Sequence, residues 1–373
     1  MTSPATTNLL GLPRAELERF VADLGSKPFR ARQLMNWVYK RGEGSIANMT
    51  DLAKDFRAQL SQCAEIRTPD IVTMQLSSDG TRKWKLSADA SQAFEMVFIP
   101  EKDRGTLCIS SQVGCVLDCS FCSTAQQGFN RNLTTAEIVG QVWLAKKELA
   151  NFYETREAGG DRIITNVVLM GMGEPLANFR NVVPAVRTLM DDYGFDLSRR
   201  RVTLSTSGLV PQIYKLAEET NVALAVSLHA PDDELRSELV PINRKHPIAE
   251  LLEACWHYID EQNGRSVTFE YVMLAGVNDS PAQARALATL LKGQPAKVNL
   301  IPFNPFPGTR YQRSPVEAIN GFRDELIKRG VLATIRRTRG DDIDAACGQL
   351  AGRVIDRTTV RLGNKTFGVA VQQ

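Results

Sequence analysis

The chain has 373 residues, of which 43% are hydrophobic and 23% are charged, and its formal net charge at pH 7 is +3. This length allows one large α/β domain with an appendage, or two domains, and argues against three or more. The small net charge excludes a strongly basic nucleic-acid-binding domain, so any contact with nucleic acid must come from local patches.

Residues 1–65 are predicted to form a small helical domain, because apolar residues recur at helical spacing around Leu17, Leu34 and Phe56. The first eleven residues have neither the basic nor the apolar region of a signal peptide, and no uninterrupted apolar run is long enough for a transmembrane helix. We therefore expect a soluble, cytoplasmic and monomeric protein with no membrane partner.

Residues 66–103 are predicted to be a short β-rich connector. Residues with high strand propensity lie at 71–76, 84–86 and 94–99, and the Ser-Asp-Gly sequence at 78–80 marks a turn. This pattern is typical of antiparallel strands.

Residues 104–345 alternate apolar strands with helical stretches, which indicates parallel β/α units. Thr134 and Glu137 form a capping box that opens the first of these helices. A closed eight-stranded barrel typically needs ~250 residues. We therefore expect an α/β fold in which a partial (β/α)6 barrel, open on one side, is followed by a C-terminal segment, 346–373. The predicted strands are 106–110, 163–170, 202–207, 222–228, 267–274 and 298–303.

Cys115, Cys119 and Cys122 follow the first predicted barrel strand in the spacing C-x3-C-x2-C. Three thiolates on one loop can hold three irons of a [4Fe–4S] cluster, which leaves the fourth iron free to chelate the amino and carboxylate groups of S-adenosylmethionine (SAM). The alternatives are a zinc site or buried free thiols. Zinc needs a fourth ligand nearby, and the first histidine downstream is His229. Thiols kept for a metal suit a reducing compartment.

The carboxyl ends of later strands carry polar residues that could bind SAM. Gly173 and Glu174 lie in Gly-Met-Gly-Glu-Pro, where glycine lets the backbone approach a ligand and the carboxylate can accept hydrogen bonds from the SAM ammonium group. The alternative for each position is an ordinary turn or a satisfied polar strand end. The remaining candidates are Ser205, Ser227, Leu228, His229 and Asn304.

Two further cysteines, Cys108 and Cys347, have open interpretations. Small residues around Cys347 suggest a mobile loop able to carry a thiol into the site. From the residues alone, a free buried cysteine is the better interpretation of both. Glu95, which alternates with Phe94 and Met96, is best interpreted from its pattern as lying on the solvent face of a strand.

The motifs together closely resemble the RlmN/Cfr family of radical SAM RNA methyltransferases, over roughly residues 12–361. The resemblance implies a partial (β/α)6 barrel with an N-terminal accessory domain, a [4Fe–4S] cluster and two SAM molecules per turnover. The matching sequences are Cys-x6-Cys-x3-Cys-x2-Cys, Gly-Met-Gly-Glu-Pro, Leu-Ser-Thr-Ser-Gly, Ser-Leu-His-Ala, Ile-Pro-Phe-Asn-Pro and Arg-Gly-Asp-Asp-Ile-Asp-Ala-Ala-Cys-Gly-Gln-Leu.

The resemblance also implies roles for the three residues left open. Cys347 would be methylated by one SAM, and a radical formed from a second SAM would remove a hydrogen atom from that methyl group. The resulting carbon radical would add to adenine and form a covalent protein–RNA adduct. Glu95 would accept the proton of the substituted carbon, and Cys108 would release the product by forming a transient disulfide with Cys347.

The implied substrates are carbon 2 of adenine in 23S rRNA, at the peptidyl-transferase centre, and in tRNA, beside the anticodon. The implied reductant is an external flavodoxin or ferredoxin-like protein. Alternatives are methylation of carbon 8, a radical SAM enzyme with a non-RNA substrate, and a non-catalytic cluster-containing RNA-binding protein. The candidate phosphate contacts are Lys27, Arg30, Arg32, Lys40, Arg41, Arg199, Arg200, Arg201, Arg336, Arg337 and Arg339.

Overall fold

The computed structural model describes residues 6–153, 163–262, 266–346 and 348–358. Its centre is one ten-stranded sheet in the order β14-β13-β12-β11-β10-β9-β6-β5-β4-β3. The strands from β14 to β6 are parallel, and those from β6 to β3 are antiparallel. Their bounds are β3 Ile71–Leu76, β4 Arg82–Ser87, β5 Ala93–Pro100, β6 Gly105–Cys108, β9 Asn166–Leu169, β10 Val202–Thr206, β11 Ala223–Ser227, β12 Val267–Met273, β13 Ala296–Pro302 and β14 Leu332–Ile335.

The parallel part of the sheet is the predicted partial barrel, and all six predicted strands are present as β6 and β9 to β13. The structure adds a seventh parallel strand, β14, which the sequence analysis did not predict. This strand is short and its first residue, Leu332, is 57% exposed, so it lacks the apolar run that marks the other six. The six predicted β/α units are therefore present, and β14 is an additional parallel strand after the last of them.

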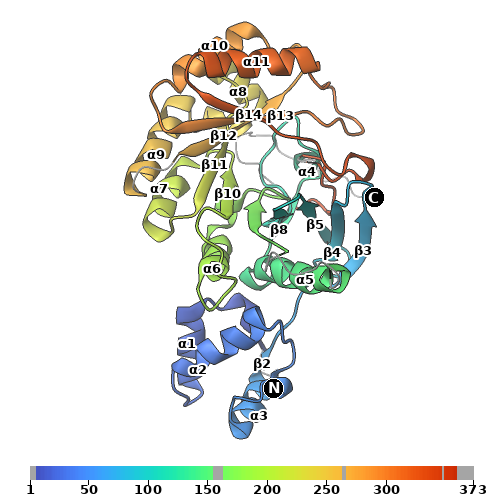
Figure 1. Cartoon of the computed structure of the whole chain (residues 1–373), viewed down its shortest axis with the longest axis vertical. Coiled ribbons are helices and arrows are strands. Elements are labelled where there is room, and N and C mark those ends of the chain that lie inside the picture. The colour runs from blue at the N-terminus through green and yellow to red at the C-terminus, as the bar shows by residue number, and fades with distance from the viewer. Residues whose placement is uncertain (1–5, 154–162, 263–265, 347, 359–373) are drawn as a thin grey trace.

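Helices connect consecutive parallel strands and cover the outer side of the curved sheet, as Figure 1 shows for α7, α9, α10 and α11. The predicted capping box begins α5: the backbone N–H of Glu137 donates to Thr134 Oγ1 over 3.2 Å, and Glu137 Oε2 accepts from the backbone N–H of Thr134 over 2.8 Å. The barrel helices are α4 Ser123–Gln126, α5 Thr135–Tyr153, α6 Phe179–Met190, α7 Val210–Glu219, α8 Asp233–Leu239, α9 Ile248–Glu261, α10 Pro281–Leu290 and α11 Val316–Lys328. None of the described helices is long and apolar enough to cross a membrane.

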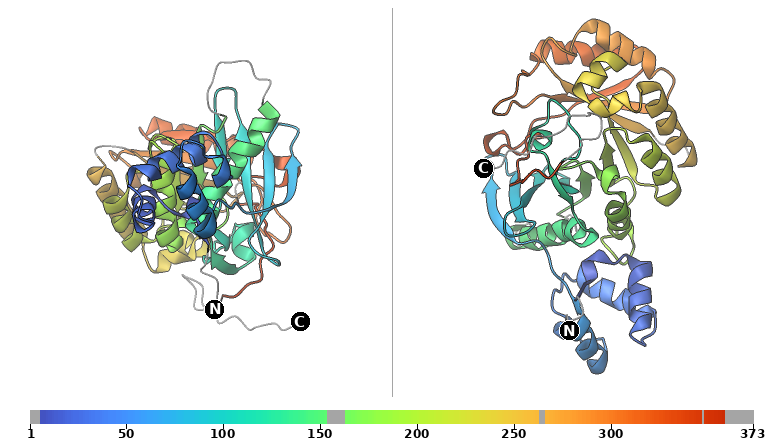
Figure 2. Two further views of the ribbon diagram at one scale, coloured as in Figure 1. Left: turned by 90° about the horizontal axis from the view of Figure 1, so that it is seen from below. Right: turned by 180° about the vertical axis from the view of Figure 1, so that it is seen from behind.

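The N-terminal helices form a separate lobe below the barrel (Figures 1 and 2). The lobe packs on α5, where the indole N–H of Trp143 donates to the Val38 carbonyl over 2.8 Å. An ion pair of 3.1 Å between Arg14 and Asp191 also joins it to the barrel. Its elements are α1 Arg14–Asp23, α2 Phe29–Met35, α3 Lys54–Cys63, the paired strands β1 Thr7–Asn8 and β2 Ala64–Glu65, the short 3-10 helices η1 Leu9–Gly11 and η3 Ile46–Asn48, and the π-helical stretch η2 Asn36–Lys40.

The antiparallel strands β3, β4 and β5 extend the barrel sheet, because β5 pairs directly with β6. The C-terminal segment returns to this extension: Ala93 and Arg353 exchange backbone hydrogen bonds of 2.9 and 3.0 Å. Residues distant in sequence therefore meet beside β5. The remaining short elements are the hairpin β7 Gln112–Gly114 with β8 Phe129–Asn132, and the turns η4 Pro175–Asn178, η5 Pro241–Arg244 and η6 Asp341–Ile343.

Candidate functional site

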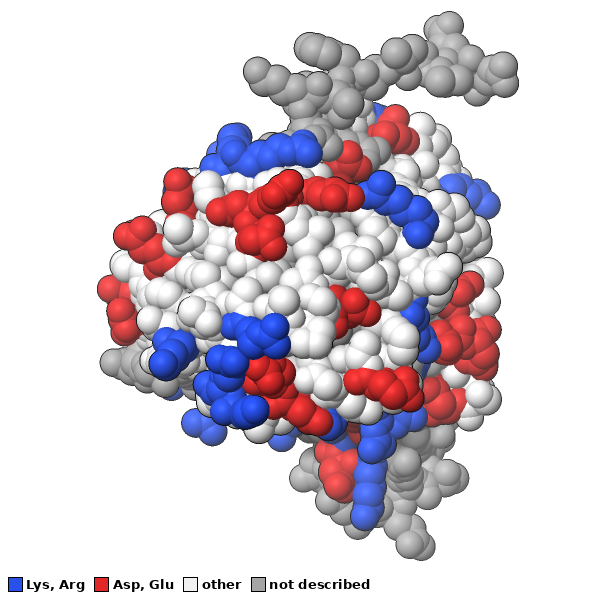
Figure 3. All heavy atoms as spheres, turned by 90° about the horizontal axis from the view of Figure 1, so that it is seen from above, with Lys and Arg blue, Asp and Glu red and all other residues white. Residues whose placement is uncertain are grey.

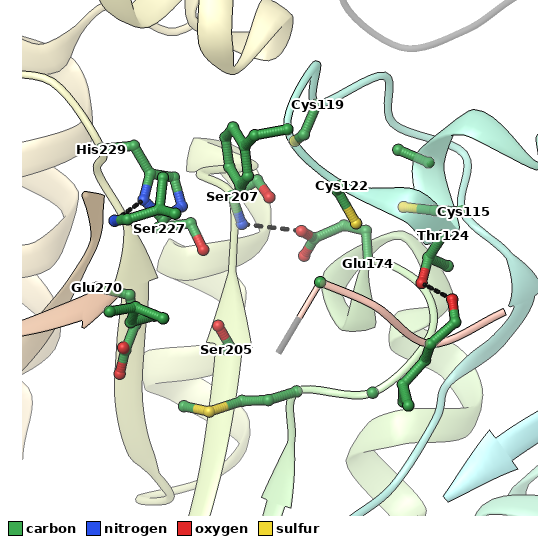
Figure 4. Close-up of a pocket in the computed structure, with 18 of the residues that line it drawn as sticks. Cys115, Cys119, Cys122, Thr124, Glu174, Ser205, Ser207, Ser227, His229 and Glu270 are labelled. Atoms are coloured by element: carbon green, nitrogen blue, oxygen red, sulfur yellow. Dashed lines mark hydrogen bonds between the residues drawn. The ribbon is translucent and has the colours of Figure 1, made fainter. Parts of the chain in front are cut away.

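A pocket of about 1050 Å³, its open mouth included, lies at the carboxyl ends of the parallel strands. Figure 4 shows Cys115, Cys119 and Cys122 on one side of it, Ser227 and His229 on the other, and Glu174 between them. Carboxyl ends of parallel strands are where β/α folds bind ligands. The polar lining also includes Thr124, Ser205, Thr206, Ser207, Glu270, Asn304 and Arg336.

The three cysteines occupy a loop that begins after β7 and ends at α4. The backbone N–H of Cys115 donates to the Gly128 carbonyl over 2.8 Å, and that of Cys122 donates to the Cys119 carbonyl over 3.2 Å. Backbone hydrogen bonds, one within the loop and one to the residue that precedes β8, therefore hold the loop in shape.

The thiol set fits a multi-iron cluster better than a single ion. Among the described residues, no three Cys, His, Asp or Glu side chains are close enough together to hold one metal ion. Burial, and next the neighbouring Cys122, raise the pKa of Cys119 to about 12, and burial likewise raises the pKa of Cys115. Buried thiols such as those of Cys115 and Cys119 become thiolates only beside a strong positive charge, which a cluster of several irons supplies.

Glu174 is held rigidly at the end of β9. Its carboxylate accepts hydrogen bonds from the backbone N–H groups of Ser207, over 2.8 Å, and Leu176, over 3.0 Å. Burial raises its pKa, while these hydrogen bonds oppose the rise. Gly173 has a φ of +100°, and a Cβ there would come within 2.5 Å of the Gln112 side chain, so the motif requires glycine. The carboxylate has lone pairs left for an ammonium group.

His229 is locked as a neutral ring. Its Nδ1 accepts a 3.0 Å hydrogen bond from the backbone N–H of Val272, so the neutral ring carries its proton on Nε2. Burial, and next the charge of Arg236, lower its pKa to about 3. His229 can therefore donate one hydrogen bond in the pocket, but it cannot act as a cationic acid near pH 7.

The other predicted SAM contacts divide into two groups. Ser205, Ser227 and Asn304 line the same pocket, from β10, β11 and the loop after β13. Leu228 is fully buried and is not among the described residues that line the pocket; its carbonyl accepts from Arg236 Nε over 3.1 Å. Any contact of Leu228 with a ligand would therefore involve its backbone.

Glu95 is 3% exposed, so its placement on a solvent face, which its sequence pattern favoured, is wrong. Its carboxylate lies 3.9 Å from the ammonium groups of both Lys83 and Lys85. It also accepts a 3.0 Å hydrogen bond from the backbone N–H of Ala351. Burial raises the pKa of Glu95, and the charge of Lys83 is the largest opposing influence. The carboxylate is thus buried beside the segment that follows Cys347.

Cys347 itself lies outside the described residues, but its neighbours contact the pocket. The Gly348 carbonyl accepts a 2.8 Å hydrogen bond from the backbone N–H of Ser123, next to the last cluster cysteine. The hydroxyl of Thr124 donates to the Leu350 carbonyl over 2.8 Å. Cys108 is 5% exposed on β6, beside β5, and is not among the described residues that line the pocket.

Several pocket residues were missed by the sequence analysis. Glu270, on β12, is 5% exposed, and its carboxylate accepts a 2.7 Å hydrogen bond from Asn299. A carboxylate inside the apolar run Val267–Met273 was the signal that could have identified it. Phe121, between two of the cluster cysteines, packs edge-on against His229 with ring centroids 4.6 Å apart. No sequence pattern indicated that contact.

The predicted basic contacts do not form one uniform patch. Several are already paired with acidic groups, such as Lys40 with Asp196 at 3.5 Å, Arg32 with Glu18 at 3.7 Å and Arg339 with Asp79 at 3.7 Å. Figure 3 shows acidic and basic residues interspersed on the face seen from above. Arg336 is the one candidate of this set that also lines the pocket.

Comparison with known proteins agrees with this site. Residues 7–66 match the family model of the ribosomal RNA large subunit methyltransferase N-terminal domain, and residues 109–287 match that of the radical SAM superfamily. The dual-specificity RNA methyltransferase RlmN of Marinobacter nauticus is 54% identical over 352 residues, which cover 94% of each chain.

A solved structure is also similar over nearly the whole chain. The crystal structure of a radical SAM methyltransferase from Sphaerobacter thermophilus has a TM-score of 0.84 and 45% sequence identity, and the match covers 92% of this chain and 99% of that one. The chain therefore belongs to the radical SAM superfamily and, within it, to the RlmN family of RNA methyltransferases.

Proposed function

We propose that this enzyme methylates carbon 2 of adenine in 23S rRNA and in tRNA, through a methylated Cys347 and a covalent protein–RNA intermediate. The observation that carries the proposal is the position of the Cys347 segment. Gly348 is bonded to the cluster loop through Ser123, and Ala351 is bonded to the carboxylate of Glu95. Cys347 directly precedes this anchored segment in sequence, so a thiol carried there would serve both the SAM pocket and a buried base.

The cofactors of the family are a [4Fe–4S] cluster and SAM. Cys115, Cys119 and Cys122 would hold the cluster, and Glu174 with the polar strand ends would hold SAM. Bound together, they would supply a radical able to remove hydrogen from the methyl group on Cys347, and a carbon radical formed there can add to an electron-poor adenine carbon.

The protein side chains handle the other steps. Cys347 carries the methyl carbon that is transferred, and Glu95 accepts the proton from the substituted adenine carbon. A buried carboxylate with a raised pKa is a stronger base than an exposed one. The adduct radical must first give up one electron, which the bound cluster would accept. Cys108, as a thiolate, then attacks the sulfur of Cys347: a disulfide forms, the bond from that sulfur to the product carbon breaks with its electron pair on carbon, and that carbon takes up a proton to become the methyl group.

The RNA must present an unstacked base at the mouth of the pocket, so loops are better substrates than duplexes. The N-terminal lobe offers exposed cations for phosphate contacts, among them Lys27 and Arg41. Arg41 lies over the ring of Trp37 at 4.0 Å, which fixes the guanidinium on the surface. An acidic flavodoxin or ferredoxin-like protein would supply the electron.

The test is an anaerobic reaction of the reconstituted protein with SAM, dithionite and a hairpin RNA, followed by mass spectrometry of the nucleosides. We expect 2-methyladenosine, and S-methylcysteine at position 347 in the peptide map. A product of 8-methyladenosine would overturn the regiochemistry. Turnover by protein whose Cys347 is unmodified throughout would overturn the mechanism.

A further inference from the structure

Arg236, on α8, is a fully buried cation beside the pocket that the proposed mechanism does not use. Its Nη2 donates to the carbonyls of Ser207, over 2.8 Å, and Ser227, over 3.0 Å. Its Nε donates to the carbonyl of Leu228 over 3.1 Å. One guanidinium thus ties together the carboxyl ends of β10 and β11, which carry two of the predicted SAM contacts.

The acceptors of Arg236 are neutral oxygens. Its fourth hydrogen bond, from Nη1 over 2.6 Å, goes to the amide oxygen of Asn243. Asn243 is in turn held by Asp233, whose Oδ1 accepts from its amide nitrogen over 2.9 Å. The carboxylate therefore orients the guanidinium through an intervening amide and does not contact it. Because neutral groups do not cancel its charge, a buried cation bonded only to them still attracts negative charge on other nearby groups.

The cluster loop is one of those neighbours. The backbone N–H of Ser120, within the cysteine loop, donates to the carbonyl of Leu239 at the end of α8 over 3.1 Å. Arg236 also donates to the Ser207 carbonyl, and Ser207 lines the same pocket as Cys119. The same short helix therefore supports the cluster loop with its last residue and the SAM rim with its guanidinium.

The glycine of the Leu-Ser-Thr-Ser-Gly motif gives independent support. A Cβ on Gly208 would lie 3.3 Å from Arg236 Nη2, and the φ of Gly208 is +108°. The strand end therefore turns sharply and leaves space where the guanidinium lies. The positive φ and the closeness of Leu251 Cδ1, at 3.1 Å, also favour glycine at this position, so the guanidinium is one of three reasons for it.

We propose that Arg236 is a positioning residue, which fixes the SAM-binding ends of β10 and β11 and places a permanent positive charge beside the cluster. This inference rests on the proposed function, because it assumes that the pocket holds the cluster and SAM. Reduction adds negative charge to the cluster, so a nearby buried cation stabilises the reduced state and raises the midpoint potential.

Two substitutions separate the two roles. Arg236→Lys keeps the charge but cannot reach four acceptors in a planar fan, so SAM should bind severalfold more weakly with the midpoint potential little changed. Arg236→Gln removes the charge, so the potential should shift to more negative values as well. The matched control is Lys245→Gln, which removes an exposed cation nine residues further along the chain and should change neither property.

The experiment is a redox titration of the anaerobically reconstituted proteins, followed by electron paramagnetic resonance with and without SAM, alongside iron counts. A cluster retained in Arg236→Lys but lost in Arg236→Gln would also support the charge role. Equal potentials in Arg236→Gln and wild type, equal SAM binding in Arg236→Lys and wild type, or loss of the cluster in both variants would overturn the inference. A wild-type protein that binds no SAM would instead overturn the proposed function.

Discussion

The two halves of the site are built in different ways. On the SAM side, Glu174 is bonded to Ser207, 33 residues away in sequence, at the adjacent ends of β9 and β10. On the side of Cys347, Glu95 is bonded to Ala351, 256 residues away. The first half belongs to the sheet, whereas the second depends on a C-terminal segment laid across β4 and β5.

This difference suggests a division of labour. Strand ends held by backbone hydrogen bonds give a rigid site that can grip SAM without rearrangement. The C-terminal segment is held by backbone bonds, such as those of Gly348 with Ser123 and of Arg353 with Ala93, and by side-chain bonds, all of them to residues far away in the sequence. The bonds concerned include that of Lys83 to the Asp344 carbonyl, at 3.3 Å, and that of Gln349 to the Pro305 carbonyl, at 3.1 Å.

The largest effect should come from the rigid half. Cys119→Ala should abolish cluster assembly and all SAM cleavage, because the loop then offers only two thiolates. The matched control is Cys255→Ala, which removes a buried thiol outside the pocket lining. Iron analysis and visible absorbance after anaerobic reconstitution measure cluster assembly in the two variants. A full iron count with cleavage in Cys119→Ala would refute the cluster assignment.

The second-largest effect should come from the half of the site on the side of Cys347. Cys108→Ala should leave cluster assembly and Cys347 methylation intact but trap the RNA on Cys347, because no thiolate then attacks that sulfur. Denaturing electrophoresis should show a ribonuclease-sensitive shift. If Cys108 were only a small buried residue, the variant would turn over normally with a loss of stability of roughly 1 kcal/mol. Normal turnover without the shift would remove Cys108 from the mechanism.

A smaller effect should appear in the pH dependence of product release. If Glu95 is the proton acceptor, it must be ionised to act, so release should slow as pH falls through its raised pKa. Lys83→Met removes the positive charge that most lowers the pKa of Glu95, so this pKa should rise further. The fall in the release rate at acidic pH should then begin at a higher pH. Lys85→Met should move it less, because the Lys85 side chain is 35% exposed against 9% for Lys83. If the pH at which release slows is the same in both variants as in the wild type, Glu95 is not the base.

The smallest effect should come from the barrel scaffold outside both halves. Thr134→Ala removes the N-cap of α5 and should lower the free energy of unfolding by about 1 kcal/mol. Iron content and SAM binding should stay at wild-type levels, which chemical denaturation and reconstitution can check. A loss of cluster in this variant would show that the site depends on the whole barrel, and would weaken the division into halves.

The same division explains what the sequence could predict. The cluster loop, the six parallel strands and the polar strand ends depend on local spacing and on apolar runs, and these patterns can be read along the chain. β14 was missed because it is short and half exposed. The burial of Glu95 was missed because the segment that covers it lies 256 residues away in sequence, and the local pattern of apolar residues carries no information about so distant a contact.

Arg236 shows a second limit of prediction from the sequence. It lies in the polar sequence Asp-Glu-Leu-Arg-Ser-Glu-Leu, which is typical of a solvated helix, yet the side chain is fully buried. Its burial depends on backbone carbonyls at the ends of β10 and β11, and carbonyl groups have no sequence signature. Such contacts emerge only once the strands are placed in space.

The most direct test of the central claim is mass spectrometry of nucleosides from 23S rRNA and tRNA of cells that lack the gene. We predict that 2-methyladenosine disappears from both RNAs and returns when the wild-type gene is restored. It should not return when the restored gene encodes the Cys119→Ala variant. Retention of 2-methyladenosine in both RNAs of the deleted strain, in cells with no second such enzyme, would contradict the account.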